Sequence, residues 1–267
     1  MKNNNEIKFA QGTKEWASTT LNIQTGCKND CKYCYAKCMA LRFGRATPEL
    51  WGTKVVPHKS AANCRKRKGT IMFPSTHDIM PDNIDACLAT IKNLLGAGNS
   101  LLIVSKPRLG CIKQLCKELE SYKAQILFRF TMGSADDTVL KYWEPGAPGF
   151  AERILALAYA YGQGYSTSVS MEPMLDVNPG AVIDKVKPFV TDKVWLGKIN
   201  RLRQTLAVNC PGDQDARKCA DALIASQNDA YINQLYATYK SDPQIAWKDS
   251  IKKVVGIDRP TVAGLDI

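Results

Sequence analysis

The sequence predicts an α/β protein whose core is a parallel sheet, and three observations support this prediction. Segments with strand and helix patterns alternate along the chain, and six strand–helix units fit between residues 19 and 203. Residues 101–105 are almost entirely apolar, which is typical of a strand buried on both faces of a parallel sheet. The length of 267 residues and the hydrophobic content of 45% suffice for a substantial core. We therefore expect a polar lead-in over residues 1–18, a core over residues 19–203, and a helical extension over residues 204–267 packed on that core.

The first part of the chain is expected to form a strand, a loop and a helix. Residues 19–24 alternate apolar with polar side chains, which indicates the first strand. A cysteine-rich loop follows, and residues 35–45 then carry apolar side chains at helical spacing. Residues 46–69 are irregular and basic, and residues 64–68 form the densest positive cluster in the chain.

From residue 70 onward, strands and helices are expected to alternate regularly. Asp82 or Asn83 is expected to cap the second helix, and Gly96 and Gly98 to end it. The expected strands are residues 70–74, 101–105, 125–132, 165–171 and 193–199, and the expected helices are residues 84–95, 111–121, 150–162 and 181–189. Residues 213–255 turn helical and polar, with a stripe expected to pack against the core at Tyr231, Leu235, Tyr236 and Tyr239.

The loop after the first strand carries the clearest chemical pattern. Cys27, Cys31 and Cys34 stand in C-x3-C-x2-C spacing, with the aromatic Tyr33 just before the third cysteine. This spacing gathers three thiolates in one loop and suits three corners of a cubane iron–sulfur cluster. Three protein ligands leave one iron open.

A fourth cysteine leaves an alternative open. Cys38 extends the pattern to C-x3-C-x2-C-x3-C, which also suits a closed zinc site or a closed electron-transfer cluster. Structural zinc sites usually bring their ligands as two separated pairs, whereas these four cysteines lie within twelve positions. The alternative makes the chain a non-enzymatic iron–sulfur or zinc binding module.

The cysteine triplet with its aromatic residue resembles the radical S-adenosylmethionine (SAM) superfamily. The resemblance implies a [4Fe–4S] cluster held by Cys27, Cys31 and Cys34, with SAM chelating the fourth iron. It also implies an external electron donor such as a flavodoxin or a ferredoxin.

Further motifs narrow the resemblance to the spore photoproduct lyase-like branch, often labelled DNA repair photolyases. They are residues 26–36, the pair Ser105 and Lys106, and residues 144–148 followed by Arg153. The likeness covers roughly residues 19–200. It implies a partial (β/α)6 TIM-like barrel, and reductive cleavage of SAM to methionine and a 5′-deoxyadenosyl radical that abstracts hydrogen from the substrate.

Two features depart from that branch. Its lyases place a hydrogen-donor cysteine at a defined position, and no cysteine here matches it by local motif, which leaves Cys38, Cys64, Cys111 and Cys210 as candidates. The sequence after Arg203 matches no part of the family pattern. A radical-based modification of nucleotides is therefore as well supported as the repair of a thymine dimer.

Polar residues follow the expected strands at their carboxyl ends, where the sites of parallel α/β proteins collect. On charge grounds we expect Lys106 to meet the carboxylate of SAM and Asp78 to meet its amine or a ribose hydroxyl. The other expected SAM-binding residues are Tyr33, Thr76, Ser105, Ser134 and Glu172. The remaining polar residues at these strand ends are His77, Arg129, Lys198 and Asn200, and a lone histidine such as His77 is more often a structural hydrogen-bond partner.

The charge balance indicates a polyanionic partner. The chain has 36 Lys and Arg residues against 25 Asp and Glu residues, a formal net charge of +11. Such an excess favours phosphate binding, so we expect a nucleic acid base as the substrate. A lysine-rich solvated surface is the alternative explanation of the charge, and a peptide or a small metabolite is the alternative substrate.

The cysteine usage indicates a reducing compartment. Ten cysteines, without a secretory signal at the N-terminus, favour metal ligation and free thiols over a disulfide framework. No apolar run is long enough to cross a bilayer. We expect a cytoplasmic protein without membrane contact.

Overall fold

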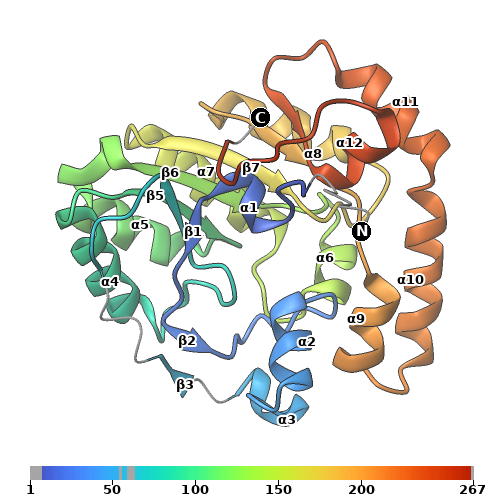
Figure 1. Cartoon of the computed structure of the whole chain (residues 1–267), viewed down its shortest axis with the longest axis horizontal. Helices are drawn as coiled ribbons and strands as arrows, with labels where there is room; N and C mark the ends of the chain where they lie inside the picture. Colours follow the sequence, from blue (N-terminus) through green and yellow to red (C-terminus); the bar gives the residue numbers. More distant parts are fainter. Residues whose placement is uncertain (1–7, 54–55, 59–63, 266–267) are drawn as a thin grey trace, which may run out of the picture.

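The computed structural model describes residues 8–53, 56–58 and 64–265, and its centre is a curved parallel sheet (Figure 1). Seven strands pair in the order β1-β4-β5-β6-β7-β8-β9, and every neighbouring pair is parallel. These strands are β1 (Thr19–Thr20), β4 (Thr70–Phe73), β5 (Ser100–Ser105), β6 (Ile126–Thr131), β7 (Ser166–Met171), β8 (Val194–Leu196) and β9 (Ile245–Trp247). Two further strands, β2 (Gln24–Thr25) and β3 (Val56–Pro57), form a separate antiparallel pair.

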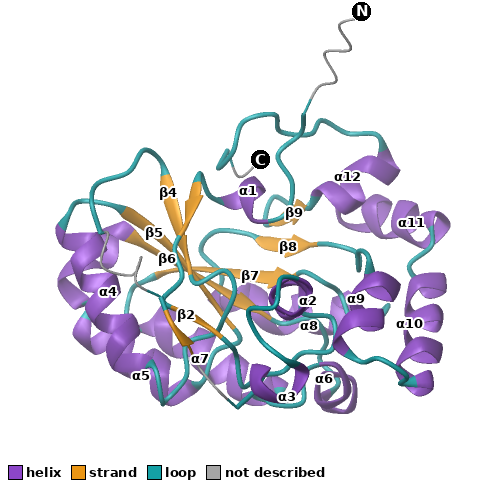
Figure 2. Cartoon of the chain, turned by 60° about the horizontal axis from the view of Figure 1, so that its bottom comes forward, coloured by secondary structure: helices purple, strands orange, loops and turns teal. Residues whose placement is uncertain are grey.

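Helices connect the strands and cover the outside of the sheet, as Figures 1 and 2 show. The helices of the first half are α1 (Thr13–Trp16), α2 (Tyr35–Arg42), α3 (Pro48–Trp51), α4 (Ile84–Gly96), α5 (Leu109–Glu118) and α6 (Asp137–Trp143). Those of the second half are α7 (Phe150–Gly162), α8 (Pro179–Val186), α9 (Leu202–Asn209), α10 (Gln214–Ser226), α11 (Asp229–Tyr239) and α12 (Asp249–Val255). Short 3-10 helices occupy Glu120–Gln125 and Lys187–Phe189. No helix in the described part of the chain has both the length and the apolar character needed to cross a membrane.

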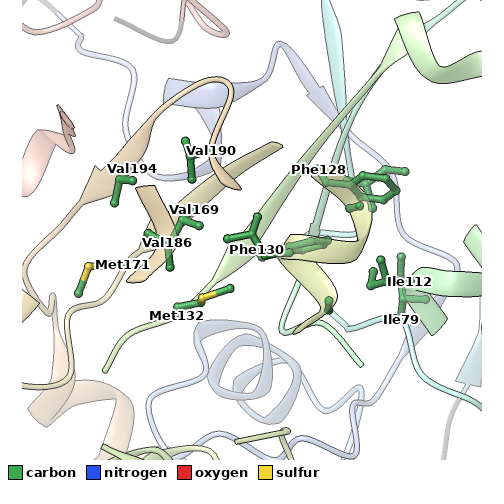
Figure 3. Close-up of a cluster of buried hydrophobic side chains, with 14 of the residues drawn as sticks. Ile79, Ile112, Phe128, Phe130, Met132, Val169, Met171, Val186, Val190 and Val194 are labelled. Atoms are coloured by element: carbon green, nitrogen blue, oxygen red, sulfur yellow. The ribbon is translucent and has the colours of Figure 1, made fainter. Parts of the chain in front are cut away.

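The period-two alternation of each strand separates an outer core from the interior of the barrel. Ile103 and Phe128 belong to the large outer cluster, which Figure 3 shows around Phe128, Phe130 and Val169. Alternate residues, such as Met72 and Leu102, belong to a second cluster inside the curve of the sheet. The same alternation brings polar side chains to the interior, where a site can form.

The sheet is a partial TIM-like barrel. Segments from near both ends of the chain pack beside its two edge strands. Trp16 of α1 lies inside the curve, with its ring 5.9 Å from that of Trp195 on β8. The backbone N–H of Ala10 donates to the Pro260 carbonyl over 2.7 Å, and that of Gly264 donates to the Lys14 carbonyl over 2.8 Å. The interior is therefore filled beside β1 and β9, whose outer edges have no strand partner within the described ranges.

Six of the seven strands of this sheet lie where the sequence predicts them, and the α/β prediction is confirmed. The first was predicted too long, because the chain leaves the sheet after Thr20 and residues 24–25 pair with β3 instead. Helix α6 was not predicted, although the Asp136 carboxylate caps it by accepting from the Thr138 N–H over 2.7 Å.

The tail departs from the helical expectation at one place. Residues 213–255 hold helices α10, α11 and α12, but Ile245–Trp247 form β9 and extend the sheet beside β8. A three-residue strand is too short to show a period in the sequence, and its partner is set by tertiary packing. The ring of Tyr236 on α11 lies 5.2 Å from that of Trp247, so part of the aromatic stripe packs on this strand. The boundaries drawn at residues 18 and 203 stay predictions.

Candidate functional site

A cavity of about 320 Å³ opens at the carboxyl ends of the parallel strands, and the cysteine loop forms one of its walls. Cys27, Cys31 and Cys34 all line it. The loop is held by a hydrogen bond from the Cys27 N–H to the Trp51 carbonyl over 3.1 Å. The Cys34 sulfur caps α2 by accepting from the Lys37 N–H over 3.4 Å. Cys34 therefore lies at a helix N-terminus, where the backbone dipole favours a negative charge.

Cys38 has different surroundings. It lies one turn into α2, is only 6% exposed, and is absent from the lining of the cavity. This arrangement favours three cysteine ligands over four. Across the part of the chain that the structure describes, no three His, Cys, Asp or Glu side chains are gathered closely enough to hold a metal ion. The assignment of a cluster to Cys27, Cys31 and Cys34 therefore stays a prediction.

Burial keeps the three thiols protonated in the absence of a compensating cation. It raises the pKa of Cys27 to about 12, with a further contribution from the negative charge of Asp78. Burial also raises the pKa of Cys31 and that of Cys34. Thiolates in such surroundings become favourable when metal cations replace the protons, and soft thiolate ligands suit iron–sulfur clusters. The donor set and its position on the cavity wall fit a cluster.

Glu144 fixes two cavity residues from behind. It is fully buried, and its carboxylate accepts from the Tyr33 hydroxyl and, over 2.5 Å, from Arg153 Nη2. The ammonium of Lys106 lies 3.7 Å from the same carboxylate. Burial by itself would raise the pKa of Glu144, but the positive charges of Lys106 and Arg153 outweigh it and lower that pKa. The carboxylate is therefore ionised and holds Tyr33 and Lys106 at the cavity wall.

Asp78 joins the cysteine loop to the end of β5. Its carboxylate accepts from Asn29 Nδ2 over 2.6 Å, from the Lys106 N–H over 3.0 Å and from the Ser105 hydroxyl. The Ile79 N–H donates to it as well, over 2.8 Å. Asp78 lines the cavity as expected, but most of its hydrogen-bonding capacity serves the protein itself.

The predicted SAM-binding residues divide into two groups. Five line the cavity, namely Tyr33, Thr76, Asp78, Lys106 and Glu172, and so do Lys198 and Asn200. Ser105 and Ser134 do not line it. The Ser105 hydroxyl donates to Asp78, and the Ser134 hydroxyl accepts from the Asp136 N–H over 2.9 Å. Contact with SAM stays a prediction for the first group and has no geometric support for these two serines.

Arg129 and His77, which the sequence also places at strand ends, have structural roles. Arg129 lies in the middle of β6, and its guanidinium is buried, 3.0 Å from Asp192 and 4.8 Å from the Trp16 ring. It therefore lies below the cavity, because its position in the strand sets its depth in the barrel. His77 lines the cavity, but its Nε2 accepts from the Ile23 N–H over 3.2 Å, and burial lowers its pKa to about 4.

The inner end of the cavity holds polar atoms that a ligand can satisfy. Ser170 and Trp16 line it, and the Ser170 hydroxyl and the Trp16 Nε1 are buried without a hydrogen-bond partner among the described residues. The Glu172 carboxylate, which also lines the cavity, forms an ion pair within the protein, since Lys248 Nζ lies 3.2 Å from it. Orphaned buried polar atoms are costly, so their presence in this cavity fits a ligand rich in hydrogen-bonding groups such as SAM.

Three supporting residues were missed by the sequence analysis. Asn29 sits between Asp78 and Arg108, whose Nη2 donates to the Asn29 side-chain oxygen over 3.0 Å. Asn209 of α9 donates to the carbonyls of Lys32 and Cys34, over 2.9 Å each. Lys248 of the tail lies beneath the cavity. Asn29 falls inside the cysteine motif, which is a usable signal, whereas nothing local marks Asn209 or Lys248.

Comparisons with known sequences give distant relatives. No protein-family model matches the chain. An uncharacterised protein of Acidianus two-tailed virus is 25% identical over 176 residues, which are 61% of this chain and 57% of the relative. An uncharacterised protein of Methanocaldococcus jannaschii is 25% identical over 185 residues, 65% of this chain and 67% of the relative. The chain thus matches little more than half of the viral relative's length.

The similarity to solved structures covers more of the chain than the similarity to known sequences does. Spore photoproduct lyase complexed with dinucleoside spore photoproduct matches with a TM-score of 0.54 and 16% identity, over 91% of this chain and 79% of that one. A variant of that lyase with bound AdoMet and the same dinucleoside gives a TM-score of 0.53 at 15% identity and the same coverage. Streptococcus suis SuiB bound to S-adenosylmethionine gives 0.51 at 12% identity, over 90% of this chain and 52% of that one. The chain therefore has a fold similar to those of spore photoproduct lyase and SuiB, a partial TIM-like barrel.

Proposed function

We propose that the protein is a radical SAM enzyme that acts on a nucleic acid base. The observation that carries this proposal is the orientation of the cysteine loop: Cys27, Cys31 and Cys34 line the cavity, and Cys38 does not. Lys106 and Lys198 line the same cavity. The cavity beside the three thiols leaves space for a chelating cofactor and for a substrate next to that cofactor.

The residues around the cavity have complementary roles toward SAM. Cys27, Cys31 and Cys34 would hold a [4Fe–4S] cluster, which would supply one electron, received from a donor such as a flavodoxin or ferredoxin, for the reductive cleavage of SAM. Lys106, held by Glu144, presents an ammonium to the SAM carboxylate. Asp78 and Glu172 present carboxylates to the amine and the ribose hydroxyls. Met72, Val104 and Ala36 give the cavity apolar walls that exclude water from the reacting carbon.

The substrate class rests on two supports. The net charge of +11 favours a polyanion. The similar structure of spore photoproduct lyase is complexed with dinucleoside spore photoproduct, which is built from nucleosides. The second candidate is a peptide, which the SuiB structure with its precursor peptide SuiA favours at a TM-score of 0.51. Salt-sensitive binding of DNA or RNA separates the two candidates, because phosphate contacts weaken steeply with salt.

Anaerobic reconstitution with iron and sulfide tests the reaction itself. After reduction with dithionite we expect the EPR signal of a reduced [4Fe–4S] cluster, a shift of that signal when SAM is added, and release of 5′-deoxyadenosine on chromatography. A redox-silent metal, or a cluster whose signal SAM does not change, contradicts the proposal. A stable metal site without 5′-deoxyadenosine release supports the non-enzymatic binding module instead.

A further inference from the structure

A second groove adjoins the cavity and has a volume of about 430 Å³. Tyr35, Ala36 and Thr76 line both, so the groove meets the cavity at its mouth. Its other walls come from the segment between β1 and β2, from residues of α2, and from Trp51, His58 and Arg67. A long ligand that places one unit in the cavity therefore has a continuous path over α2.

The groove is cationic. Arg45 and Arg67 line it, and none of the described residues along it is an Asp or a Glu. The ring nitrogens of His58 contact the Thr25 hydroxyl over 2.7 Å and the Asn22 carbonyl over 3.3 Å, which fixes this side chain in the groove wall. Guanidinium groups suit an anionic ligand, and their planar shape matches phosphate oxygens in particular.

An exposed stripe of large side chains runs along the same helix. Tyr35 is 51% exposed, Met39 is 41% exposed and Phe43 is 66% exposed. Their spacing of four residues places them on one face of α2 and its C-terminal cap. The Tyr35 hydroxyl donates to the Ser75 carbonyl over 2.5 Å, which fixes this ring at the mouth of the cavity. The Arg45 guanidinium lies 5.6 Å from the Phe43 ring, so a cation and an aromatic face stand together.

We propose that this groove binds the single-stranded polynucleotide on one side of the reacting base. Arg45 and Arg67 contact its phosphates, and Tyr35 and Phe43 stack on its bases. This inference rests on the proposed nucleic acid substrate and names where that substrate is held. Alternating aromatic surface and cationic groups is the pattern of single-strand sites, because unpaired bases expose the faces on which rings stack. A duplex keeps those faces stacked internally and offers only its backbone.

Fluorescence anisotropy with labelled oligo(dT) and oligo(U) tests the groove without SAM or cluster chemistry. Strands of about 12 nucleotides fall within the range of single-strand sites, ~4–16 nucleotides. We compare wild type with the double variant R45A/R67A over a series of KCl concentrations. Each lost phosphate contact removes about 0.7 from the slope of log K against log salt for a single strand, so we expect the slope to fall by about 1.4. The DNA and RNA probes show which polymer is preferred.

Three further variants make the result specific. K117A/K240A removes two exposed positive charges on α5 and after α11, away from the groove, and should keep the wild-type slope. R45K/R67K restores the charges and should recover most of the slope, which a misfolded protein would not do. F43A should weaken binding by about tenfold without changing the slope, because it removes stacking and no charge.

The outcomes separate the groove from the proposed reaction. Equal slopes for R45A/R67A and K117A/K240A overturn the inference, and so does wild-type protein that binds neither polymer. Wild type that releases 5′-deoxyadenosine but fails to bind either polymer keeps the radical chemistry and removes the nucleic acid. Groove-dependent binding without any 5′-deoxyadenosine release supports the groove and contradicts the proposed enzyme.

Discussion

Cys34 and Cys38 are one helical turn apart and have different surroundings. Cys34 caps α2 beside the cavity, whereas Cys38 is buried within the helix and does not line the cavity. We expect Cys34→Ala to abolish assembly of the cluster and Cys38→Ala to leave it assembled. Cluster assembly is measured by the iron and sulfide content and the visible absorption of the reconstituted proteins. Loss of the cluster in both variants would show a closed four-cysteine site.

His77 makes stability depend on pH in a predictable direction. Its Nε2 accepts from the Ile23 N–H and its Nδ1 lies 3.1 Å from the Asp78 carbonyl, so the neutral imidazole fits its surroundings. Burial lowers its pKa from 6.5 to about 4. Between these values the unfolded chain binds more protons than the folded one, so the free energy of unfolding rises with pH across this window and falls as pH drops.

The size of this effect can be measured by urea unfolding between pH 4 and pH 7. A shift of that extent corresponds to about 3 kcal/mol at most. We expect His77→Gln to flatten the dependence relative to wild type, because the amide oxygen of glutamine accepts the same hydrogen bond and does not titrate. Identical pH profiles for the two proteins would contradict the buried neutral histidine.

At the scale of elements, the cysteine loop depends on a close approach by the loop between α6 and α7. The Gly146 N–H donates to the Asn29 carbonyl over 3.0 Å. A methyl group on Gly146 would collide with the Lys28 carbonyl oxygen and lie 3.0 Å from the Asn29 Cα. The backbone of both loops must therefore shift if any side chain is added here.

We expect Gly146→Ala to destabilise the protein by about 1–3 kcal/mol, as overpacking does, and to impair loading of the cluster. The matched control is Gly162→Ala in α7, where a Cβ meets nothing within 4 Å and alanine favours the helix. Thermal unfolding and iron content distinguish the two variants. An unchanged Tm and full iron content in Gly146→Ala would show that the contact between the loops is not required.

A second element, α9, supports the same loop from the other side. Figure 2 shows α9 beside α2, and the two helices are packed together. Asn209 connects them through its hydrogen bonds to the carbonyls of Lys32 and Cys34. The segment after residue 200 thus takes part in shaping the site, although its sequence shows no motif.

At the scale of the whole molecule, Lys248 connects the tail, the N-terminal helix and the sheet. It is fully buried, and its ammonium lies 2.9 Å from Glu15, 3.2 Å from Glu172 and 3.7 Å from the centroid of the Trp16 ring. Burial raises the pKa of Glu15, and the attraction of Lys248 opposes that rise. The single ammonium compensates two carboxylates that come from distant parts of the chain.

Removing this ammonium should therefore be costly. We expect Lys248→Met to destabilise the protein by about 3–5 kcal/mol, because it leaves the buried Glu15 carboxylate without a compensating positive charge. The exposed pair Lys92–Glu118, 2.7 Å apart, gives the control: Lys92→Met should cost about 1 kcal/mol or less. Chemical denaturation measures both. Equal small losses would show that the buried network contributes no more than a surface pair.

The sequence by itself determined the α/β class, the order of the main strands and the three cysteines that face the cavity. These features are local, because strand and helix periods and the C-x3-C-x2-C spacing act over a few residues. The tertiary structure decided which polar residues share the cavity: Ser105 is used by Asp78, and Lys248 arrives from the tail through β9. How deeply such a side chain is buried, and which groups it contacts, depend on contacts between segments far apart in the chain. A local sequence pattern does not predict such contacts.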